Sequence, residues 1–530
     1  MLFRILTSAL QGVEAHAVHV EADVSPGIPH TQIVGLPDAS VRESRDRVHA
    51  AVRNSGYEMP PARITLNLAP AGLPKEGSGF DLPIALALLA ASGQIPGEGL
   101  ERRLFLGELS LDGSLRPVRG VLVAAVAARR MGAAGIVVSV GNRREALSVE
   151  GLEVGAAGSL REAAERAADP GFHERGQASE GRARRPGGVD LADVRGQDEA
   201  RRALEIAAAG GHNLFMVGPP GAGKTMLARR LSTVLPPLAG EDSLEATMIH
   251  SIAGVLSAGG APLHEPPFRA PHHTVSDVGL VGGGNPPRPG EVSLAHRGVL
   301  FLDELPEFRR SALEALRQPA EDGRVSVVRA GRSAVFPARF QLVAAMNPCP
   351  CGKAGEGPGA CRCTSTEIRR YRARLSGPLL DRVDLHVRVP AVGLERLTGG
   401  EPGESSESVR ERVEAARRAQ YAGERGAGGR GVVNAELSGR DLERACALPA
   451  GGKALLATAL RRRGLSARGV HRVMRVARTI ADLADAEEVA LPHLAEAVRY
   501  RVLPEVGTGA TRPGDGISLE RTGRTAYRRA

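Results

Sequence analysis

The chain has 530 residues, of which 42% are hydrophobic and 24% are charged. A chain of this length exceeds what a single hydrophobic core supports, so two or three domains are expected. It contains no apolar run long enough to cross a bilayer, which excludes a membrane-spanning helix. Residues 1–20 lack the apolar stretch and small-residue cleavage site of a signal peptide, so we expect a cytoplasmic protein.

The formal net charge is +9 at pH 7, and it is unevenly distributed. Residues 1–169 are close to neutral, and the remainder carries the basic excess. A basic surface of this kind favours a polyanionic partner, of which nucleic acid is the commonest. An arginine-rich protein without any such partner fits the charge equally well, so the charge alone leaves both interpretations open.

Composition divides the chain into successive blocks. Residues 1–168 alternate short apolar runs with Gly/Pro turns, and 169–189 have the composition of a flexible linker. A strand–loop–helix pattern typical of an α/β domain runs through 190–397. Residues 398–503 have apolar residues at helical spacing, and the Gly-, Thr- and Arg-rich tail 504–530 is predicted to be disordered.

A phosphate-binding loop is the strongest motif in the chain. Residues 213–217 form a short apolar strand that leads into the sequence GPPGAGKT, and 226–235 are predicted to be a helix. Glycines in this loop allow backbone N–H groups to surround phosphates, Lys224 can reach the β- and γ-phosphates, and Thr225 can ligate Mg²⁺. The motif therefore predicts binding of ATP with Mg²⁺ through Gly218, Pro219, Pro220, Gly221, Ala222, Gly223, Lys224 and Thr225.

Two later strands end in polar residues that suit the same site. The apolar run 299–302 is followed by Asp303, a candidate for the Mg²⁺ shell, and Glu304, a candidate for activating the attacking water. The run 340–346 is followed by Asn347, whose amide could bond the γ-phosphate or the water. Capping of the turn before the next proline is the alternative role of this asparagine.

Between these two strands the pattern predicts a β-hairpin with arginines at its tip. Alternating apolar residues flank Ala-Gly in 324–336, which places Arg329 and Arg332 at the turn. Such arginines would contact nucleic-acid phosphates without reading the base sequence. An ordinary solvated hairpin is the alternative.

Four of the five cysteines lie in one short segment. Two C-x-C pairs in a protein expected to be cytoplasmic favour a metal site over disulfides, and four thiolates are a preferred ligand set for structural Zn²⁺. The spacing differs from the commoner C-x₂-C, so zinc is an expectation and not a motif match. The four residues are Cys349, Cys351, Cys361 and Cys363.

The order of strand, phosphate loop, Asp-Glu and Asn resembles an AAA+ ATPase. Residues 267–274 (PFRAPHHT) and 288–296 (RPGEVSLAH) resemble the magnesium-chelatase-like branch and, within it, the ComM/YifB family, over about residues 1–503. The resemblance implies an α/β chain in three parts. These are an N-terminal Lon-protease-like (ribosomal S5 domain 2-like) α+β domain, a central AAA+ P-loop α/β domain and a C-terminal helical lid.

The resemblance also implies roles for two arginines. The segment 376–385 (SGPLLDRVDL) resembles the one that supplies an arginine finger to the neighbouring subunit, which assigns that role to Arg382. The segment 465–469 (LSARG) resembles the second sensor, with Arg468 contacting phosphate. Both roles imply a closed homo-oligomeric ring, a hexamer as in related motors, in which the hairpin projects into the pore. Surface ion pairs are the alternative for both arginines.

Residues 73–83 and 107–113 carry the resemblance to the Lon-type protease fold, which uses a Ser–Lys pair. The family's motif places Gly79 at the serine position, with Ser78 one residue away. The lysine position falls at about Ala124, in a segment, 118–130, that contains no lysine. The domain is therefore predicted to be proteolytically inactive.

The function implied by the resemblance is an ATP-dependent hexameric DNA motor. Its expected activity is that of a branch-migration helicase on single-stranded and branched DNA, promoting homologous recombination in natural transformation. A magnesium-chelatase-type motor subunit that drives metal insertion is one alternative, and an ATP-dependent protein-remodelling factor is another.

Overall fold

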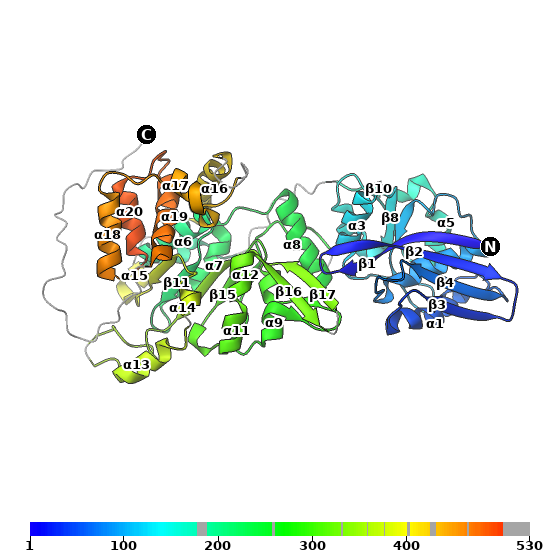
Figure 1. Cartoon of the computed structure of the whole chain (residues 1–530), viewed down its shortest axis with the longest axis horizontal. Coiled ribbons are helices and arrows are strands. Elements are labelled where there is room, and N and C mark those ends of the chain that lie inside the picture. The colour runs from blue at the N-terminus through cyan, green and yellow to red at the C-terminus, as the bar shows by residue number, and fades with distance from the viewer. Residues whose placement is uncertain are drawn as a thin grey trace.

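The computed structural model is elongated, with the N-terminal domain at one end, a parallel sheet in the middle and the C-terminal helices at the other end (Figure 1). Of the predicted linker, 178–187 lie outside the described residues, as do residues 502–530, which include the whole of the predicted tail, 504–530. No helix within the described part of the chain is long and apolar enough to cross a membrane. The structure describes residues 1–177, 188–256, 260–329, 332–357, 359–375, 377–399, 403–423, 431–463 and 466–501.

The N-terminal domain is built on a mixed sheet with the strand order β10-β9-β8-β5-β1-β2-β4-β3. Its last strand, β10, pairs antiparallel with β9 inside the segment expected to be linker, so the ordered domain extends beyond residue 168. The strands are β1 (Leu2–Gln11), β2 (Glu14–Ser25), β3 (His30–Val34), β4 (Arg63–Ala69), β5 (Arg103–Phe105), β8 (Gly135–Ser139), β9 (Glu153–Ala157) and β10 (His173–Arg175), with a separate pair β6 (Glu108–Leu109) and β7 (Leu115–Arg116).

Helix α2 (Asp81–Ala91) is the centre of this domain, because all of its residues are buried. A helix that is apolar on every side must be covered on every side. The buried carboxylate of Asp81 is compensated by Arg47 of α1, whose Nε lies 2.8 Å from Asp81 Oδ2. The other helices of the domain are α1 (Ala39–Asn54), α3 (Val121–Arg130), α4 (Arg143–Leu147) and α5 (Leu160–Arg166).

The central sheet is parallel throughout, in the order β12-β15-β18-β11-β19. Strands β11, β15 and β18 are fully buried and, apart from Gln341 at the start of β18, apolar, as expected for a parallel sheet covered on both faces. The strands are β11 (Leu214–Val217), β12 (Phe268–Arg269), β15 (Val299–Leu302), β18 (Gln341–Met346) and β19 (Leu385–Arg388).

Helices and short strands surround this sheet. They are α6 (Asp198–Gly210), α7 (Lys224–Val234), α8 (Gly240–Ala253), α9 (Asp277–Val281), β13 (Gly282–Gly283), β14 (Arg288–Pro289), α10 (Glu291–Leu294), α11 (Arg310–Ala315), α12 (Arg317–Asp322), β16 (Arg324–Arg329), β17 (Arg332–Pro337), α13 (Ser365–Arg372), α14 (Gly377–Leu380) and α15 (Leu394–Gly399).

The C-terminal block is helical, as predicted, and packs directly on the sheet domain. One hydrophobic cluster runs from Leu191 to Tyr500 and includes residues of both blocks, so the two share a core. Helices α16 and α19 both lie against α6. The block contains α16 (Ser406–Ala422), α17 (Gly439–Ala445), α18 (Gly452–Arg463), α19 (Ala467–Leu483) and α20 (Leu491–Arg499).

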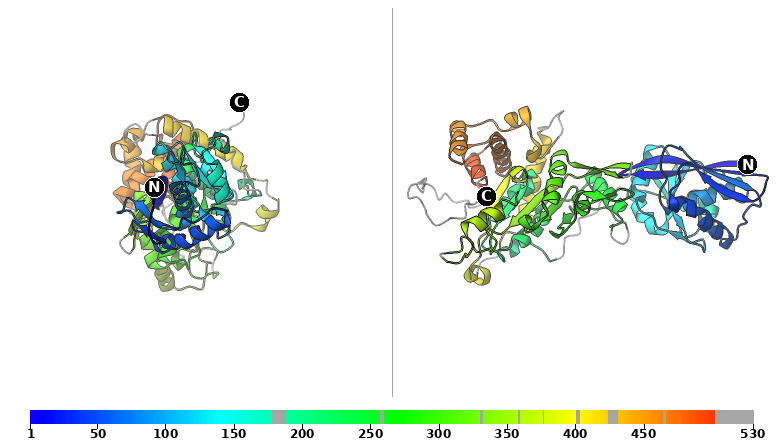
Figure 2. Two further views of the ribbon diagram at one scale, coloured as in Figure 1. Left: turned by 90° about the vertical axis from the view of Figure 1, so that its right-hand side faces the viewer. Right: turned by 60° about the horizontal axis from the view of Figure 1, so that its bottom comes forward.

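The N-terminal domain meets the central domain at α8 and at the β16–β17 hairpin (Figures 1 and 2). The tight turn between β1 and β2 lies against β17, where Gln11 Nε2 donates to the Ser333 carbonyl at 3.2 Å. Gly12 has a φ of +64°, and a Cβ on it would lie 2.9 Å from the Val335 carbonyl oxygen. At α8, the Ser251 hydroxyl donates to the buried Glu145 carboxylate.

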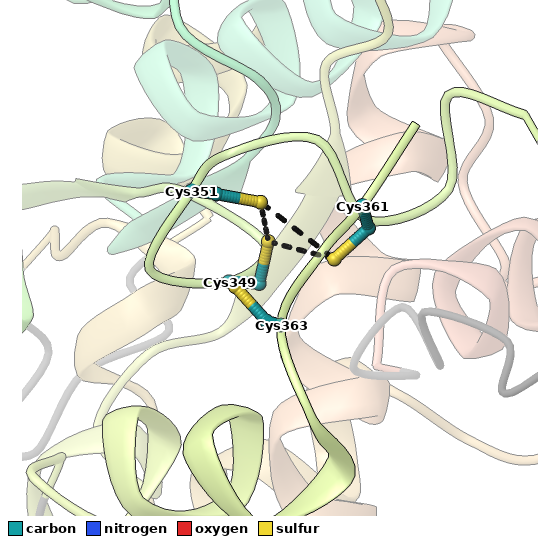
Figure 3. Close-up of side chains that lie close together, drawn as sticks. All are labelled: Cys349, Cys351, Cys361 and Cys363. Carbon is teal, nitrogen blue, oxygen red and sulfur yellow. Dashed lines mark hydrogen bonds between the residues drawn. The ribbon is translucent and has the colours of Figure 1, made fainter. Parts of the chain in front are cut away.

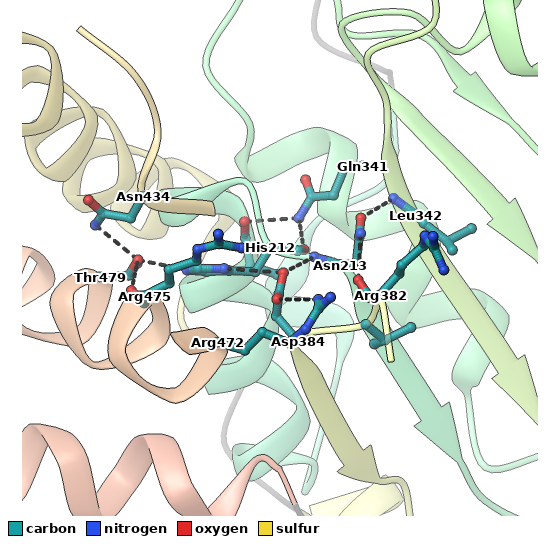
Figure 4. A network of polar contacts seen from close by, with 12 residues as sticks. His212, Asn213, Gln341, Leu342, Arg382, Asp384, Asn434, Arg472, Arg475 and Thr479 are labelled. Carbon is teal, nitrogen blue, oxygen red and sulfur yellow. Dashed lines mark hydrogen bonds and ion pairs between the residues drawn. The ribbon is translucent and has the colours of Figure 1, made fainter. Parts of the chain in front are cut away.

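A buried polar network joins the C-terminal helices to the sheet (Figure 4). Asp384, which is 5% exposed, accepts from the backbone N–H of Asn213 at 3.3 Å and pairs with Arg472 of α19 at 3.0 Å. His212 Nδ1 lies 3.5 Å from the same carboxylate. Although burial raises the pKa of Asp384, the adjacent His212 ring and the charges of Arg472 and Arg475 outweigh it and hold that pKa at about 2.

Replacement of Asp384 by Ala should lower the free energy of unfolding by about 3–5 kcal/mol, because it leaves the largely buried Arg472 guanidinium without its counter-charge. Urea denaturation followed by circular dichroism measures this change. Glu443→Ala, at an exposed position on α17, is the control and should change stability by less than about 0.5 kcal/mol. Equal midpoints for the two variants would contradict a structural role for Asp384.

Candidate nucleotide-binding and hydrolysis site

Three neighbouring parallel strands end at one edge of the central sheet. Register pairs Val217 of β11 with Met346 of β18, and Leu302 of β15 with Ala344 of β18. The residues that follow these strands therefore emerge side by side at the carboxyl edge, where ligands bind in open α/β sheets. They are the phosphate loop, Asp303 and Asn347.

The phosphate loop turns directly into α7, which begins at Lys224. Gly221 and Gly223 have φ values of +77° and +89°, a conformation that side-chain-bearing residues rarely adopt. These two glycines allow the chain to curl, so that backbone N–H groups at the start of α7 can point into one concavity. The arrangement suits a phosphate group.

Lys224 is the residue that ties the loop together. Its Nζ donates to the carbonyls of Gly218 at 2.7 Å and Pro219 at 2.8 Å, and to Asn347 Oδ1 at 3.1 Å. Burial lowers the pKa of Lys224, and the charges of Asp303 and Glu304 oppose this effect. The structure therefore brings together two of the residues that the sequence assigned to one site.

Thr225 and Asp303 also meet, because the Thr225 hydroxyl donates to Asp303 Oδ2 at 2.6 Å. A hydroxyl and a carboxylate side by side at the mouth of a phosphate loop are hard oxygen donors, which Mg²⁺ prefers. The residues present thus fit an ion held jointly by these two oxygens and by a phosphate.

Glu304 has an unusual backbone conformation with a φ of +51°, in the left-handed region. Its backbone N–H donates to Asp303 Oδ1 at 2.9 Å, and its side chain is 55% exposed. A carboxylate in this position is accessible to water. Strained conformations of this kind are concentrated at functional sites.

His273 is a neighbour of Glu304 that sequence reasoning left without a role. Its Nδ1 lies 3.5 Å from Glu304 Oε2, its ring lies 4.1 Å from that of His272, and its edge faces Phe308. In the sequence, the PFRAPHHT segment indicates only a family resemblance. The contact between His273 and Glu304 joins two loops, and a periodic sequence pattern does not predict contacts of this kind.

A cavity of about 450 Å³ opens beside the phosphate loop. One wall is the end of β11 with Gly218 and Pro219, and another is the segment that follows β19. The third wall comes from the cysteine-rich loop. The lining residues are Val217, Gly218, Pro219, Pro348, Ala354, Gly355, Glu356, Arg388, Pro390 and Ala391.

Arg382 lies at the opposite edge of the sheet from the phosphate loop. The carbonyl of Arg382 accepts from Asn213 Nδ2 at 3.0 Å, and Asn213 directly precedes β11, whereas the phosphate loop follows it. The Arg382 guanidinium pairs with Glu321. Arg468 is exposed in the first turn of α19, one turn before Arg472, which pairs with Asp384.

The predicted hairpin is present as β16 and β17, with Arg329 and Arg332 directly opposite each other at its end. The two turn residues between them lie outside the described residues, and nothing is described of the two arginine side chains. Ser333, next to Arg332, accepts the hydrogen bond from Gln11 of the N-terminal domain. The end of the hairpin is therefore adjacent to that domain.

The four cysteines of the loop converge (Figure 3). Cys349 Sγ lies 3.4 Å from that of Cys351 and 3.6 Å from that of Cys361, and the last two are 3.7 Å apart. Including Cys363, all four sulfur atoms lie within 4.8 Å of one another.

In the N-terminal domain, the residues near the expected serine position have other partners. The Ser78 hydroxyl donates to Glu108, and the buried Lys75 donates to the Pro70 carbonyl. Gly79 packs closely on Leu106, and Ala124 is buried in α3. These contacts do not form a Ser–Lys pair among the described residues, and proteolytic inactivity stays a prediction.

Substitutions of Lys224 and Glu304 should have different effects. Lys224→Ala should abolish nucleotide binding, because it removes the charge that faces the phosphates, whereas Glu304→Gln should bind ATP and lose about a hundredfold or more in turnover. Binding of a fluorescent ATP analogue and release of phosphate measure the two properties. Normal hydrolysis by Glu304→Gln would disprove the assignment of the base.

Comparison with known proteins identifies the family. The family description "Magnesium chelatase, subunit ChlI" matches residues 190–397, "Subunit ChlI of Mg-chelatase" matches 20–142, and "Magnesium chelatase, subunit ChlI C-terminal" matches 403–501. A shorter match, 30% identical over 162 residues, is to the magnesium-chelatase 67 kDa subunit of Chlorobaculum tepidum. It covers 30% of this chain and 23% of that protein.

Full-length relatives are more similar. A protein of Mycobacterium tuberculosis (strain H37Rv) is 48% identical, with 94% of this chain and 98% of that protein covered. YifB of Salmonella typhimurium (strain LT2) is 45% identical (94% and 96% covered), and the competence protein ComM of Haemophilus influenzae (strain Rd) is 44% identical (94% and 97% covered). The chain therefore belongs to the ComM/YifB family of magnesium-chelatase-like AAA+ proteins, a family that implies an ATPase.

Proposed function

We propose that the protein is an ATP-driven DNA motor that acts as a homo-hexameric ring, and that it promotes branch migration during homologous recombination in natural transformation. The full-length similarity to a protein named for competence supports the biological setting. The observation that supports a ring most directly is that Arg382 and the phosphate loop lie at opposite edges of one sheet.

The separation supports a ring because the two sets of residues cannot serve the same nucleotide. Strand β11 alone, four residues long, spans about 13 Å at about 3.3 Å per residue. The phosphate loop follows this strand, and the backbone of Arg382 is bonded to the residue before it. An arginine at that edge acts on a phosphate only when a neighbouring subunit presents one. Head-to-tail contacts that close into a ring provide this arrangement.

Within one subunit, each residue then has a distinct task. Lys224 binds the β- and γ-phosphates in place of its present carbonyl partners, and Asn347, already 3.1 Å from Lys224 Nζ, orients the γ-phosphate or the attacking water. Thr225 and Asp303 hold Mg²⁺, which supplies charge neutralisation. Glu304 accepts the proton of the attacking water.

Across the interface, Arg382 neutralises charge on the γ-phosphate in the transition state, and Arg468 contacts the same phosphates from the helical lid. In the single chain, Glu321 occupies the Arg382 guanidinium. Exchange of this exposed carboxylate for a phosphate at the subunit interface is the change that would complete the site.

Contact with DNA is assigned to the β16–β17 hairpin. Arg329 and Arg332 stand opposite each other at its end, and the part of the chain that contains them carries the basic excess. Arginines at this position bind phosphates irrespective of base sequence, as a motor that moves along DNA requires. The contact between Gln11 and Ser333 gives the N-terminal domain a direct connection to this hairpin.

A magnesium-chelatase motor subunit is the less favoured alternative. The similarity to a named chelatase subunit covers 30% of this chain, whereas the similarity to ComM covers 94%. The other alternative is an ATP-dependent protein-remodelling factor. Its support is the Lon-protease-like fold, without peptidase activity, that is proposed for the N-terminal domain.

ATP hydrolysis should increase severalfold on addition of branched or single-stranded DNA, and this increase should decline as salt rises, because phosphate contacts release counterions. Phosphate release measured with and without each DNA at several salt concentrations provides the test, with Lys224→Ala as the background. If no DNA stimulates hydrolysis at any salt concentration, the DNA-motor proposal is wrong.

Two inactive variants should restore hydrolysis when they are mixed. A Lys224→Ala subunit keeps Arg382, and an Arg382→Ala subunit keeps the phosphate loop, so some interfaces of a mixed ring contain every residue. Hydrolysis by the mixture should exceed the sum of the separate rates.

The control for this mixture pairs Lys224→Ala with the double variant Lys224→Ala/Arg382→Ala, which offers no complete interface and should give no recovery. A mixture of the two single variants that hydrolyses no faster than its components would contradict the assignment of Arg382 to the neighbouring site.

A further inference from the structure

We propose that Cys349, Cys351, Cys361 and Cys363 bind one Zn²⁺ ion, and that this ion fixes one wall of the cavity beside the phosphate loop. The first half of the proposal concerns the cysteines alone. The second half rests on nucleotide binding at the phosphate loop.

The spacing of the sulfur atoms fits a tetrahedral metal shell. With Zn–S bonds of about 2.3 Å, the sulfurs of a zinc site lie about 3.8 Å apart. Three of the pairs here are 3.4, 3.6 and 3.7 Å apart, and all four atoms lie within 4.8 Å of one another. A disulfide requires a separation of about 2.05 Å, which none of these pairs approaches.

Backbone N–H groups around the cluster favour thiolates. The N–H of Ala354 donates to Cys349 Sγ at 3.3 Å. Second-sphere donors of this kind orient metal ligands. Four thiolates this close together repel one another strongly unless a cation lies between them.

The ligand set indicates a structural zinc site. All four positions of a tetrahedron are filled by thiolates, which leaves no open position for water or substrate. Soft sulfur ligands in this geometry select Zn²⁺ or iron among the common metals. Zinc is the ion to which we commit, and iron is an outcome that the metal measurement distinguishes.

The two cysteine pairs are attached to rigid elements. Cys349 lies three residues after the end of β18, with Asn347 and Pro348 between them, so it is anchored to the central sheet. Cys363 precedes Thr364, whose side chain and that of Glu367 form a capping box at the start of α13. A metal ion between the pairs therefore connects the carboxyl end of β18 to the start of α13.

The loop that the ion would close lies on the nucleotide site. Gly352, with a φ of +80°, approaches so closely that a Cβ on it would lie 2.4 Å from Cδ of Pro220 in the phosphate loop. Gly355 accepts from Arg388 Nη2 at 3.3 Å, at the far side of the cavity. Ala354, Gly355 and Glu356 line that cavity together with Gly218 and Pro219. Opening the loop would remove this wall.

Metal content tests the first half. The purified full-length chain should contain one zinc per chain by plasma mass spectrometry, and Cys351→Ser/Cys361→Ser should contain less than a tenth of that. Cys446→Ala, which changes the remaining cysteine in the C-terminal helices, should keep the full amount. Replacement of zinc by Co²⁺ should give the visible absorption bands of a tetrahedral thiolate complex. Wild-type protein that contains no zinc, or iron in its place, overturns the assignment.

Nucleotide affinity tests the second half. Zinc-free Cys351→Ser/Cys361→Ser should bind a fluorescent ATP analogue about tenfold more weakly than wild type, with Cys446→Ala unchanged. Circular dichroism checks that the double variant is folded, and chelation of wild-type zinc gives a second zinc-free sample if it is not. Equal affinity with and without zinc refutes the link to the cavity. Failure of zinc-loaded wild type to bind nucleotide would instead refute the proposed function and leave the metal result intact.

Discussion

The position of β11 between β18 and β19 is the constraint on which the site depends. Parallel pairing on both sides fixes Val217 beside Met346 and Arg388, so the phosphate loop, Asn347 and the wall of the cavity leave the sheet at one edge. The strand is short and fully buried, so a shift in its register would expose apolar residues and displace Lys224 from Asn347. The site is therefore positioned by the sheet and not by its loops.

The amino-terminal end of β11 is held in place by charged side chains. Asp384, its backbone contact with Asn213 and its pair with Arg472 connect the start of the strand to α19. The same helix carries Arg468 in its first turn. In the proposed ring, a phosphate bound by one subunit would therefore contact a helix of its neighbour. That helix is joined through Asp384 to the strand which begins the neighbour's own phosphate loop. This chain of contacts is a physical route by which successive sites could influence each other.

The sequence predicts the residues at the carboxyl edge of the central sheet well, because each of them follows a buried strand. An apolar run followed by Gly218, by Asp303 or by Asn347 is a local signal, and the contacts of Lys224 with Asn347 and of Thr225 with Asp303 confirm that these residues meet. Local patterns say nothing of contacts between distant loops. The contact of His273 with Glu304 depends on how two loops are placed relative to each other. The spacing of residues in the sequence does not predict that placement.

Local sequence patterns also do not predict the order of the strands in a sheet. The position of Arg382 opposite its own phosphate loop follows only once β19 is known to pair with β11. The contact of Gln11 with Ser333 joins residues more than three hundred positions apart, and the predicted linker gave no sign that β10 would extend the first sheet. The helical block, for which the resemblance implies a lid, shares one hydrophobic cluster with the central sheet.

The location of the cysteine cluster follows from the same geometry. Asn347 and Cys349 are two residues apart at the end of β18, so a group that anchors Cys349 also restricts the backbone that presents the Asn347 amide to Lys224. Loop residues are ordinarily the most mobile part of such an edge. A metal-closed loop would make this one as rigid as the strand it follows, and a hydrolysis site needs its polar groups held within fractions of an ångström. The cluster is therefore best understood as part of the support for the nucleotide site.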